Sequence, residues 1–163
     1  MPTEKRWVVK PQGDPATAAM LAAALRISPV LANLLVQRGI DTVEKADKFF
    51  KPNLADLHDP FLMKDMDKAV ERVERAVRDH EKIMVYGDYD VDGCTAVALV
   101  YKFLRQIGHK NLMFYIPDRY TEGYGISVKG IDLAARKGVG LIIALDCGIK
   151  ATEKVVYAKT KGV

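Results

Sequence analysis

Cysteine and long apolar runs are both scarce in this sequence. The two cysteines, Cys94 and Cys147, lack CxxC spacing and any secretory context, so we expect reduced thiols in a cytoplasmic protein and no disulfide. No apolar run approaches the roughly 20 residues that a membrane helix needs, and the first residues, MPTEKRWVVKPQ, lack the apolar centre of a signal peptide. The sequence therefore predicts a globular protein that has no membrane partner.

Positive charge is missing from one stretch of a chain that is otherwise basic. The formal net charge is +4, which is compatible with a polyanionic partner, yet no lysine or arginine occurs between Lys82 and Lys102. The same stretch holds Asp88, Asp90 and Asp92 within MVYGDYDVDGCTA. Carboxylates this close repel one another unless a positive charge lies among them. We therefore expect a bound cation at this cluster.

Residues 1–65 have the pattern of a short helical lead-in. Residues 16–25 are rich in alanine and leucine, and Ser28 directly precedes a proline, which is typical of a helix N-cap followed by the first helical residue. That helix is expected to end near Gly39, and Thr42 is expected to cap the next one. Because no dense group of polar side chains occurs in this region, we expect the chemistry elsewhere.

Residues 66–163 have the pattern of an α/β domain with a parallel sheet and flanking helices. Apolar residues recur at helical spacing over 66–78, and the charged opposite face either contacts solvent or meets a phosphate backbone. The short apolar runs KIMVYG, NLMFYIP and VGLIIALDCG then alternate with helical patterns, which predicts strands joined by covering helices. Ligands bind such sheets beyond the carboxyl ends of the strands, where the polar clusters of this chain fall.

The aspartate cluster begins like the calcium-binding loop of an EF-hand, but two features exclude that site. Position 12 of such a loop is a glutamate, and counting from Asp88 this position is Leu99. A helix should also precede the loop, whereas IMVY has the character of a strand. A loop between a strand and a helix, with carboxylates that converge on Mg²⁺ or Mn²⁺, fits the pattern better.

Two further loops add polar residues at the same predicted edge of the sheet. Asp146 follows the third strand, where it either joins the aspartate cluster around divalent ions or caps the next turn. The loop PDRYTEGYGIS holds Arg119, Tyr124 and Gly125 and ends at Ser127, which is placed to cap the following helix. Arginine can bind phosphate through two donors and glycine permits close backbone approach, although a surface arginine beside a glycine-rich turn is the alternative.

Three ordered runs resemble the early motifs of the DHH phosphoesterase superfamily, and within it the RecJ family of single-stranded-DNA exonucleases: YGDYDVDGCTA, IPDRYTEGYGIS and LIIALDCGI. The segments ISPVLANLLVQRGIDTVEKADKFF and DPFLMKDMDKAVERV are similar to the N-terminal region of that family. The resemblance implies a 5′ to 3′ exonuclease that hydrolyses single-stranded DNA in repair and recombination with Mn²⁺ or Mg²⁺ in a two-metal site. It identifies residues 66–163 as the N-terminal part of a DHH domain.

The resemblance also implies roles for individual residues of these motifs. It assigns metal binding to Asp90, Asp92 and Asp146, of which Asp146 would bridge the ions. The catalytic residues that it implies are these three aspartates and Asp88. The loop between the motifs is expected to bind substrate through Arg119, Tyr124 and Gly125.

Two departures from the family pattern bear on the site. Related phosphatases have a histidine at the position of Tyr86, and a phenol is not an ordinary ligand of a divalent cation. The Asp-His-His motif is absent as well, because the chain ends at Val163 and none of its three histidines has a matching context. Two metal ions need about six protein ligands, so we expect an N-terminal fragment with an incomplete site and no activity alone. Such a fragment is expected to self-associate through an open edge of its sheet.

Two other functions would share the three loops. The first is a DHH phosphodiesterase of short oligonucleotides or cyclic dinucleotides, but compact enzymes of that kind begin close to their first motif, unlike this chain. The second is a non-catalytic scaffold that binds nucleic acid. A protein freed from metal chemistry would have little reason to keep its repulsive carboxylates together, which argues against the scaffold.

Overall fold

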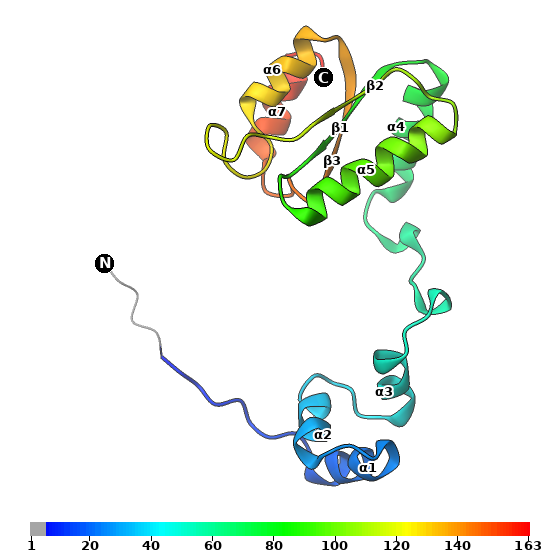
Figure 1. The fold of residues 1–163 in the computed structure, drawn as a ribbon, viewed down its shortest axis with the longest axis vertical. Helices are drawn as coiled ribbons and strands as arrows, with labels where there is room; N and C mark the ends of the chain where they lie inside the picture. Colours follow the sequence, from blue (N-terminus) through cyan, green and yellow to red (C-terminus); the bar gives the residue numbers. More distant parts are fainter. Residues whose placement is uncertain (1–5) are drawn as a thin grey trace. The chain divides into compact units, whose positions relative to one another are not determined.

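The computed structural model describes residues 6–163, which divide into two compact units (Figure 1). The first unit extends to Pro60, and the second comprises Phe61–Val163. Each unit contains buried apolar clusters of its own. Within residues 6–163, no helix is both long enough and apolar enough to span a lipid bilayer.

The first unit is helical, as the sequence predicted. It contains α1 (Pro15–Leu25), α2 (Pro29–Val36), α3 (Val43–Phe50) and the 3₁₀ turn η1 (Leu54–Asp56). Ser28 Oγ accepts a hydrogen bond from the Leu31 amide at 3.3 Å, and Thr42 Oγ1 accepts one from the Lys45 amide at 3.2 Å, so both predicted N-caps are confirmed. The three helices share a core of small and branched side chains: Ala18, Leu21, Ala32, Leu35 and Ala46.

The second unit is an α/β domain with a parallel sheet, which confirms the predicted fold class. Its elements follow the 3₁₀ turn η2 (Pro60–Leu62) in the order α4 (Met66–Arg78), β1 (Lys82–Gly87), α5 (Val91–Gln106), β2 (Leu112–Tyr115), α6 (Val128–Arg136), β3 (Val139–Leu145) and α7 (Thr152–Thr160). The strand order is β2-β1-β3, and both pairings of β1 are parallel. All three strands therefore end at the same edge of the sheet.

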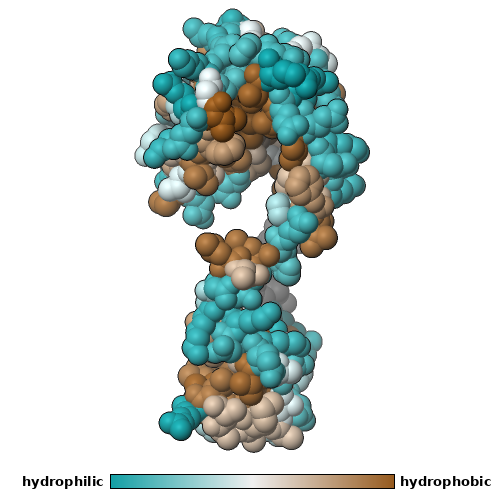
Figure 2. All heavy atoms as spheres, turned by 90° about the vertical axis from the view of Figure 1, so that its right-hand side faces the viewer, coloured by the Kyte–Doolittle hydropathy of each residue, from teal (hydrophilic) through white to brown (hydrophobic). Residues whose placement is uncertain are grey.

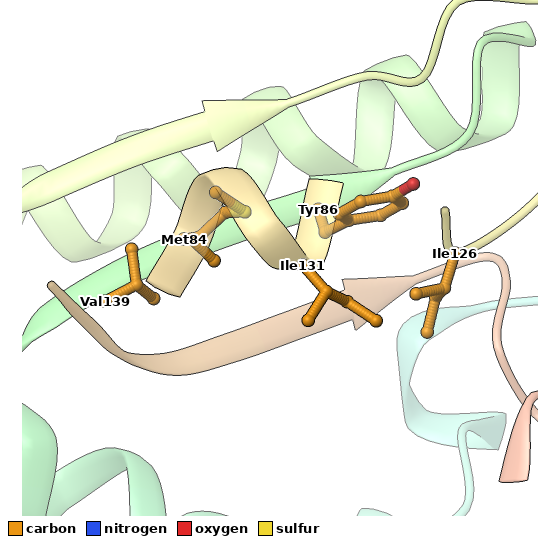
Figure 3. Close-up of a cluster of buried hydrophobic side chains, with 6 residues drawn as sticks. Met84, Tyr86, Ile126, Ile131 and Val139 are labelled. Atoms are coloured by element: carbon orange, nitrogen blue, oxygen red, sulfur yellow. The ribbon is translucent and has the colours of Figure 1, made fainter. Parts of the chain in front are cut away.

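The central strand β1 is buried on both faces, because helices cover each side of the sheet (Figure 1). Ile83 and Val85 pack on one side with residues of α4 and α5. Met84 and Tyr86 alternate with them and pack on the other side with Ile131 of α6 (Figure 3). Burial on both faces explains why this strand reads as a continuous apolar run in the sequence.

Helix α5 begins at Val91, within the aspartate motif itself. The reason is a cap: Asp90 Oδ1 accepts a hydrogen bond from the Gly93 amide at 2.9 Å. The prediction that all three aspartates lie in a loop is therefore wrong for Asp92, which lies in the first turn of the helix.

Strands β2 and β3 are the outer strands of this sheet. Part of the β3 edge is covered, because Arg72 Nη2 of α4 donates to the carbonyl oxygen of Gly140 at 2.8 Å and to Glu81 Oε2 at 2.7 Å. Apolar side chains are also exposed on this unit, including Leu99 and Phe114. The surface of both units in Figure 2 mixes such apolar areas with hydrophilic ones. Self-association through a sheet edge stays a prediction.

Candidate functional site

The site is built first from the buried carboxylate that follows β1. Asp88 has no exposed surface, and its Oδ1 accepts a hydrogen bond from the Tyr89 amide at 2.8 Å. Its Oδ2 is buried and has no hydrogen-bond partner among the described residues. A buried carboxylate oxygen without a partner is costly, because it loses its hydration and gains nothing in return. This orphaned oxygen fits a cation.

The next two aspartates belong to the start of α5 and are exposed. Asp90 is the N-cap residue, and Asp92 lies in the first helical turn. Gly93 makes this close turn possible, because an added Cβ would lie 2.5 Å from the Asp88 carbonyl oxygen and 2.6 Å from its amide nitrogen. Sequence reasoning gave no role to Gly93, although the glycine of DVDG was the available signal.

Asp146 lies at the end of β3, as predicted, and its backbone is strained. Its φ of 57° is in the left-handed region, which is unfavourable for a residue with a Cβ atom. The Tyr124 hydroxyl donates to the Asp146 carbonyl oxygen at 3.3 Å. Backbone strain of this kind persists only where the surroundings enforce it, and it is common at functional sites.

Tyr124 is the side chain at which carboxylates from two strand ends come together. Desolvation, followed by the negative charges of Asp88, Asp146 and Asp90 and by the closeness of its hydroxyl to the Asp88 carboxylate, raises the pKa of its phenol. Desolvation and the charges of Asp88 and Asp146 likewise raise the pKa of the Cys147 thiol. The negative charges of three of the four predicted aspartates therefore reach the Tyr124 phenol. Asp92 contributes to neither of these pKa shifts.

The described part of the chain, residues 6–163, contains no group of three or more His, Cys, Asp or Glu side chains already arranged around a metal position. The assignment of Asp90, Asp92 and Asp146 as metal ligands therefore stays a prediction. A cleft of about 770 Å³ opens at this edge of the sheet, lined by residues 124–126 and 146–154. Asp146 lines this cleft, whereas Asp88, Asp90 and Asp92 do not.

The loop after β2 brings the predicted substrate residues to the aspartate loop. The Arg119 guanidinium lies over the Tyr89 ring at 4.4 Å from its centroid. The Tyr124 ring meets the same Tyr89 ring edge-on, with centroids 6.1 Å apart. Gly125 is buried, with φ at 83°, a conformation that glycine adopts readily. All three predicted substrate residues lie on this one loop beside the carboxylates.

Tyr86 has a role that sequence reasoning did not foresee. Its ring is buried at the end of β1 beside Met84 and Ile131, and its hydroxyl points toward the carboxyl edge of the sheet (Figure 3). The hydroxyl donates to the Gly125 carbonyl oxygen at 2.9 Å and accepts from the Ser127 amide at 2.9 Å. Tyr86 therefore ties the end of β1 to the loop after β2 through two hydrogen bonds.

Glu122 was also missed, because nothing in the sequence separates it from a surface glutamate. Its side chain is only 4% exposed and accepts hydrogen bonds from the Tyr115 hydroxyl, the Ser127 hydroxyl and the Asp118 amide. Burial and the hydrogen bond to Glu122 raise the pKa of Tyr115 to about 12. Ser127 also caps α6 by accepting from the Gly130 amide at 2.9 Å, which confirms the predicted cap.

Comparison with known proteins identifies the family of this chain. The model of the DHH family, N-terminal domain, matches residues 82–163, about half of the chain. Single-stranded-DNA-specific exonuclease RecJ of Bacillus subtilis (strain 168) is 39% identical over 161 residues, which are 99% of this chain and 20% of that protein. The chain thus spans about a fifth of the length of this relative.

Two solved structures agree with that match. The crystal structure of RecJ in complex with Mn²⁺ from Thermus thermophilus has a TM-score of 0.64 and 26% identity, covering 93% of this chain and 20% of that one. The crystal structure of exonuclease RecJ bound to manganese has a TM-score of 0.56 and 31% identity, covering 62% and 26% of the two chains. The chain therefore belongs to the DHH family, as the ordered motifs of its sequence predicted.

Proposed function

We propose that this chain is part of a metal-dependent exonuclease that hydrolyses single-stranded DNA in the 5′ to 3′ direction during repair and recombination. The relative from Bacillus subtilis is named a single-stranded-DNA-specific exonuclease, and both structural neighbours are described with manganese. The activity is proposed for the protein as a whole, because the chain spans about a fifth of that relative.

The observation that carries the proposal is the buried Asp88 oxygen that lacks a hydrogen-bond partner among the described residues. The charges of Asp146 and Asp90 act on the same Tyr124 phenol as that of Asp88. Carboxylate oxygens are the ligands that Mn²⁺ and Mg²⁺ prefer. We therefore propose that Asp88, Asp90, Asp92 and Asp146 form the catalytic cluster, with Asp90, Asp92 and Asp146 as metal ligands and the unpartnered Asp88 oxygen available to the same cation. Divalent ions there would activate water and neutralise charge on the phosphate.

We propose that the loop after β2 binds the DNA strand. Arg119 presents a planar group of donors that suits a phosphate, and Tyr89 holds it through a cation–π contact. Tyr124 offers an exposed aromatic ring, on which a nucleobase can stack without sequence preference. Gly125 lets the backbone turn close to the carboxylates.

The test is a calorimetric titration of Mn²⁺ into the chain and into three variants. Asp90→Asn removes charge but keeps an oxygen that caps α5, so it separates metal binding from folding. Asp92→Asn has a matched control in Asp67→Asn, because both aspartates are the second residue of their helices. We expect the wild-type chain and Asp67→Asn to bind equally, and the other two variants to bind at least about tenfold more weakly. Equal binding by Asp90→Asn would contradict the metal assignment.

Substrate preference is measured separately, by fluorescence anisotropy with one labelled oligonucleotide offered single-stranded and as a duplex in the presence of Mn²⁺. We expect tighter binding of the single strand and loss of that binding in Arg119→Ala. Equal affinity for both forms would contradict the proposed substrate.

A further inference from the structure

The segment 118–127, which we call the substrate loop, must be held in place if its two exposed side chains are to act at the aspartates. It contains Gly123 and Gly125, both at positive φ and both with no atom within 4 Å of the point where a Cβ would lie, so neither glycine is fixed by packing on that side. Arg119 and Tyr124 both face solvent for much of their surface. Apart from the contact of Arg119 with Tyr89 and the hydrogen bond of Tyr124 to Asp146, their placement therefore depends on hydrogen bonds made elsewhere in the loop.

One carboxylate accepts four hydrogen bonds from three donors of this region. Glu122 Oε1 accepts from the Asp118 amide at 3.0 Å, and its Oε2 accepts from the Ser127 hydroxyl at 2.5 Å. Both oxygens also accept from the Tyr115 hydroxyl, at 2.9 and 2.7 Å. The side chain thus links the end of β2, the first residue of the loop and the N-cap of α6.

The hydrogen bonds of this network favour an ionised carboxylate. Each of the three neighbouring groups donates a hydrogen, and an ionised carboxylate is an acceptor at both oxygens without donating a hydrogen of its own. Burial alone would raise the pKa of Glu122, but hydrogen bonds from Ser127, Asp118 and Tyr115 outweigh it and lower the pKa. Lys129 Nζ lies 3.7 Å from Oε1 and adds a favourable charge.

We propose that Glu122 is a positioning residue of this site, which holds the substrate loop so that Arg119 stays on Tyr89 and Tyr124 stays at Asp146. The expected effect on strand binding rests on the proposed function. The expected effect on the order of the loop rests on the hydrogen-bond geometry alone. Among the described residues, the Glu122 side chain makes no hydrogen bond with Tyr89 or with any of the four aspartates of the proposed catalytic cluster.

The test compares Glu122→Ala and Glu122→Gln with the wild-type chain and with Glu74→Gln, an exposed glutamate of α4. Three quantities are measured: amide hydrogen exchange of residues 118–127, Mn²⁺ affinity, and affinity for a single-stranded oligonucleotide with Mn²⁺. We expect Glu122→Ala to exchange faster in the loop and to bind the oligonucleotide about tenfold more weakly, with Mn²⁺ affinity within about twofold of wild type. Glutamine should restore most of both properties, because its oxygen can still accept from Asp118 and Tyr115.

Several outcomes overturn the proposal. Wild-type exchange and oligonucleotide affinity in Glu122→Ala would do so, as would parallel losses of Mn²⁺ and oligonucleotide binding that glutamine does not restore. If Glu122→Ala does not fold, Tyr115→Phe decides, since it removes only the donor from β2; unchanged exchange of the loop would then overturn the proposal. A wild-type chain that binds neither Mn²⁺ nor oligonucleotide would refute metal and strand binding by this chain, while hydrogen exchange would still test the loop.

Discussion

Replacing Tyr86 by phenylalanine tests a buried hydroxyl of the second unit that makes two hydrogen bonds. The substitution keeps the ring, which stacks on Tyr115 with centroids 5.3 Å apart, so the packing of the core is preserved. It removes the oxygen that accepts from the Ser127 amide and donates to the Gly125 carbonyl, both at 2.9 Å. Both partner groups belong to buried residues. In the variant, the Gly125 carbonyl and the Ser127 amide would therefore lose their hydroxyl partner and have no access to solvent in its place.

The magnitude follows from these two groups. An unsatisfied buried donor or acceptor costs about 1–3 kcal/mol, so losing the partner of both groups in Tyr86→Phe is expected to lower the free energy of unfolding by about 2–6 kcal/mol. For a unit of about 100 residues, at about 4 °C per kcal/mol, this corresponds to a fall of roughly 8–24 °C in Tm. The exposed end of the substrate loop should also exchange its amide hydrogens faster, because its attachment to β1 is gone.

The assay can follow the second unit separately. All seven tyrosines lie in the second unit, so near-UV circular dichroism at tyrosine wavelengths during urea unfolding follows that unit. Tyr157→Phe is the matched control, since its hydroxyl makes one bond, to Asp132 Oδ1 at 2.7 Å, from a partly exposed residue. We expect the control to lose no more than about 1 kcal/mol. A loss in Tyr86→Phe no greater than in the control would refute the reasoning.

Two further predictions concern the aspartate loop and the acid limit of stability. Gly93→Ala should lower the free energy of unfolding by about 1–3 kcal/mol in the same urea assay, because its Cβ would lie 2.5 Å from the Asp88 carbonyl oxygen. A gain in stability, as helix propensity alone would give, would show that the loop can move aside. The lowered pKa of Glu122 should stabilise the fold above its unfolded pKa of about 4.3, and this contribution should be lost as pH falls below that value through the folded pKa. Unfolding measured from pH 7 to pH 2.5 should therefore show an acid-induced loss that is smaller in Glu122→Gln, and identical pH profiles would contradict it.

Local patterns in the sequence predicted most of the fold. The apolar run of residues 82–87 coincides with β1, because a strand buried on both faces needs apolar side chains at every position. Ser28, Thr42 and Ser127 were each predicted as N-caps and each accepts a hydrogen bond from an amide three residues on. A cap bonds only to its own helix, so a short stretch of sequence contains all the information it needs.

The sequence also indicated the residues of the site, but the tertiary structure decided how they meet. The motifs indicated the aspartates and the substrate loop, whereas only the strand order β2-β1-β3 brings the loops after all three strands to one edge. The contact between Tyr124 and Asp146 spans 22 residues of chain, and the bond between Ser127 and Tyr86 spans 41. Such partners follow from how the whole sheet packs, so no local pattern could have shown that Tyr86 holds the substrate loop or that Glu122 is buried among three donors.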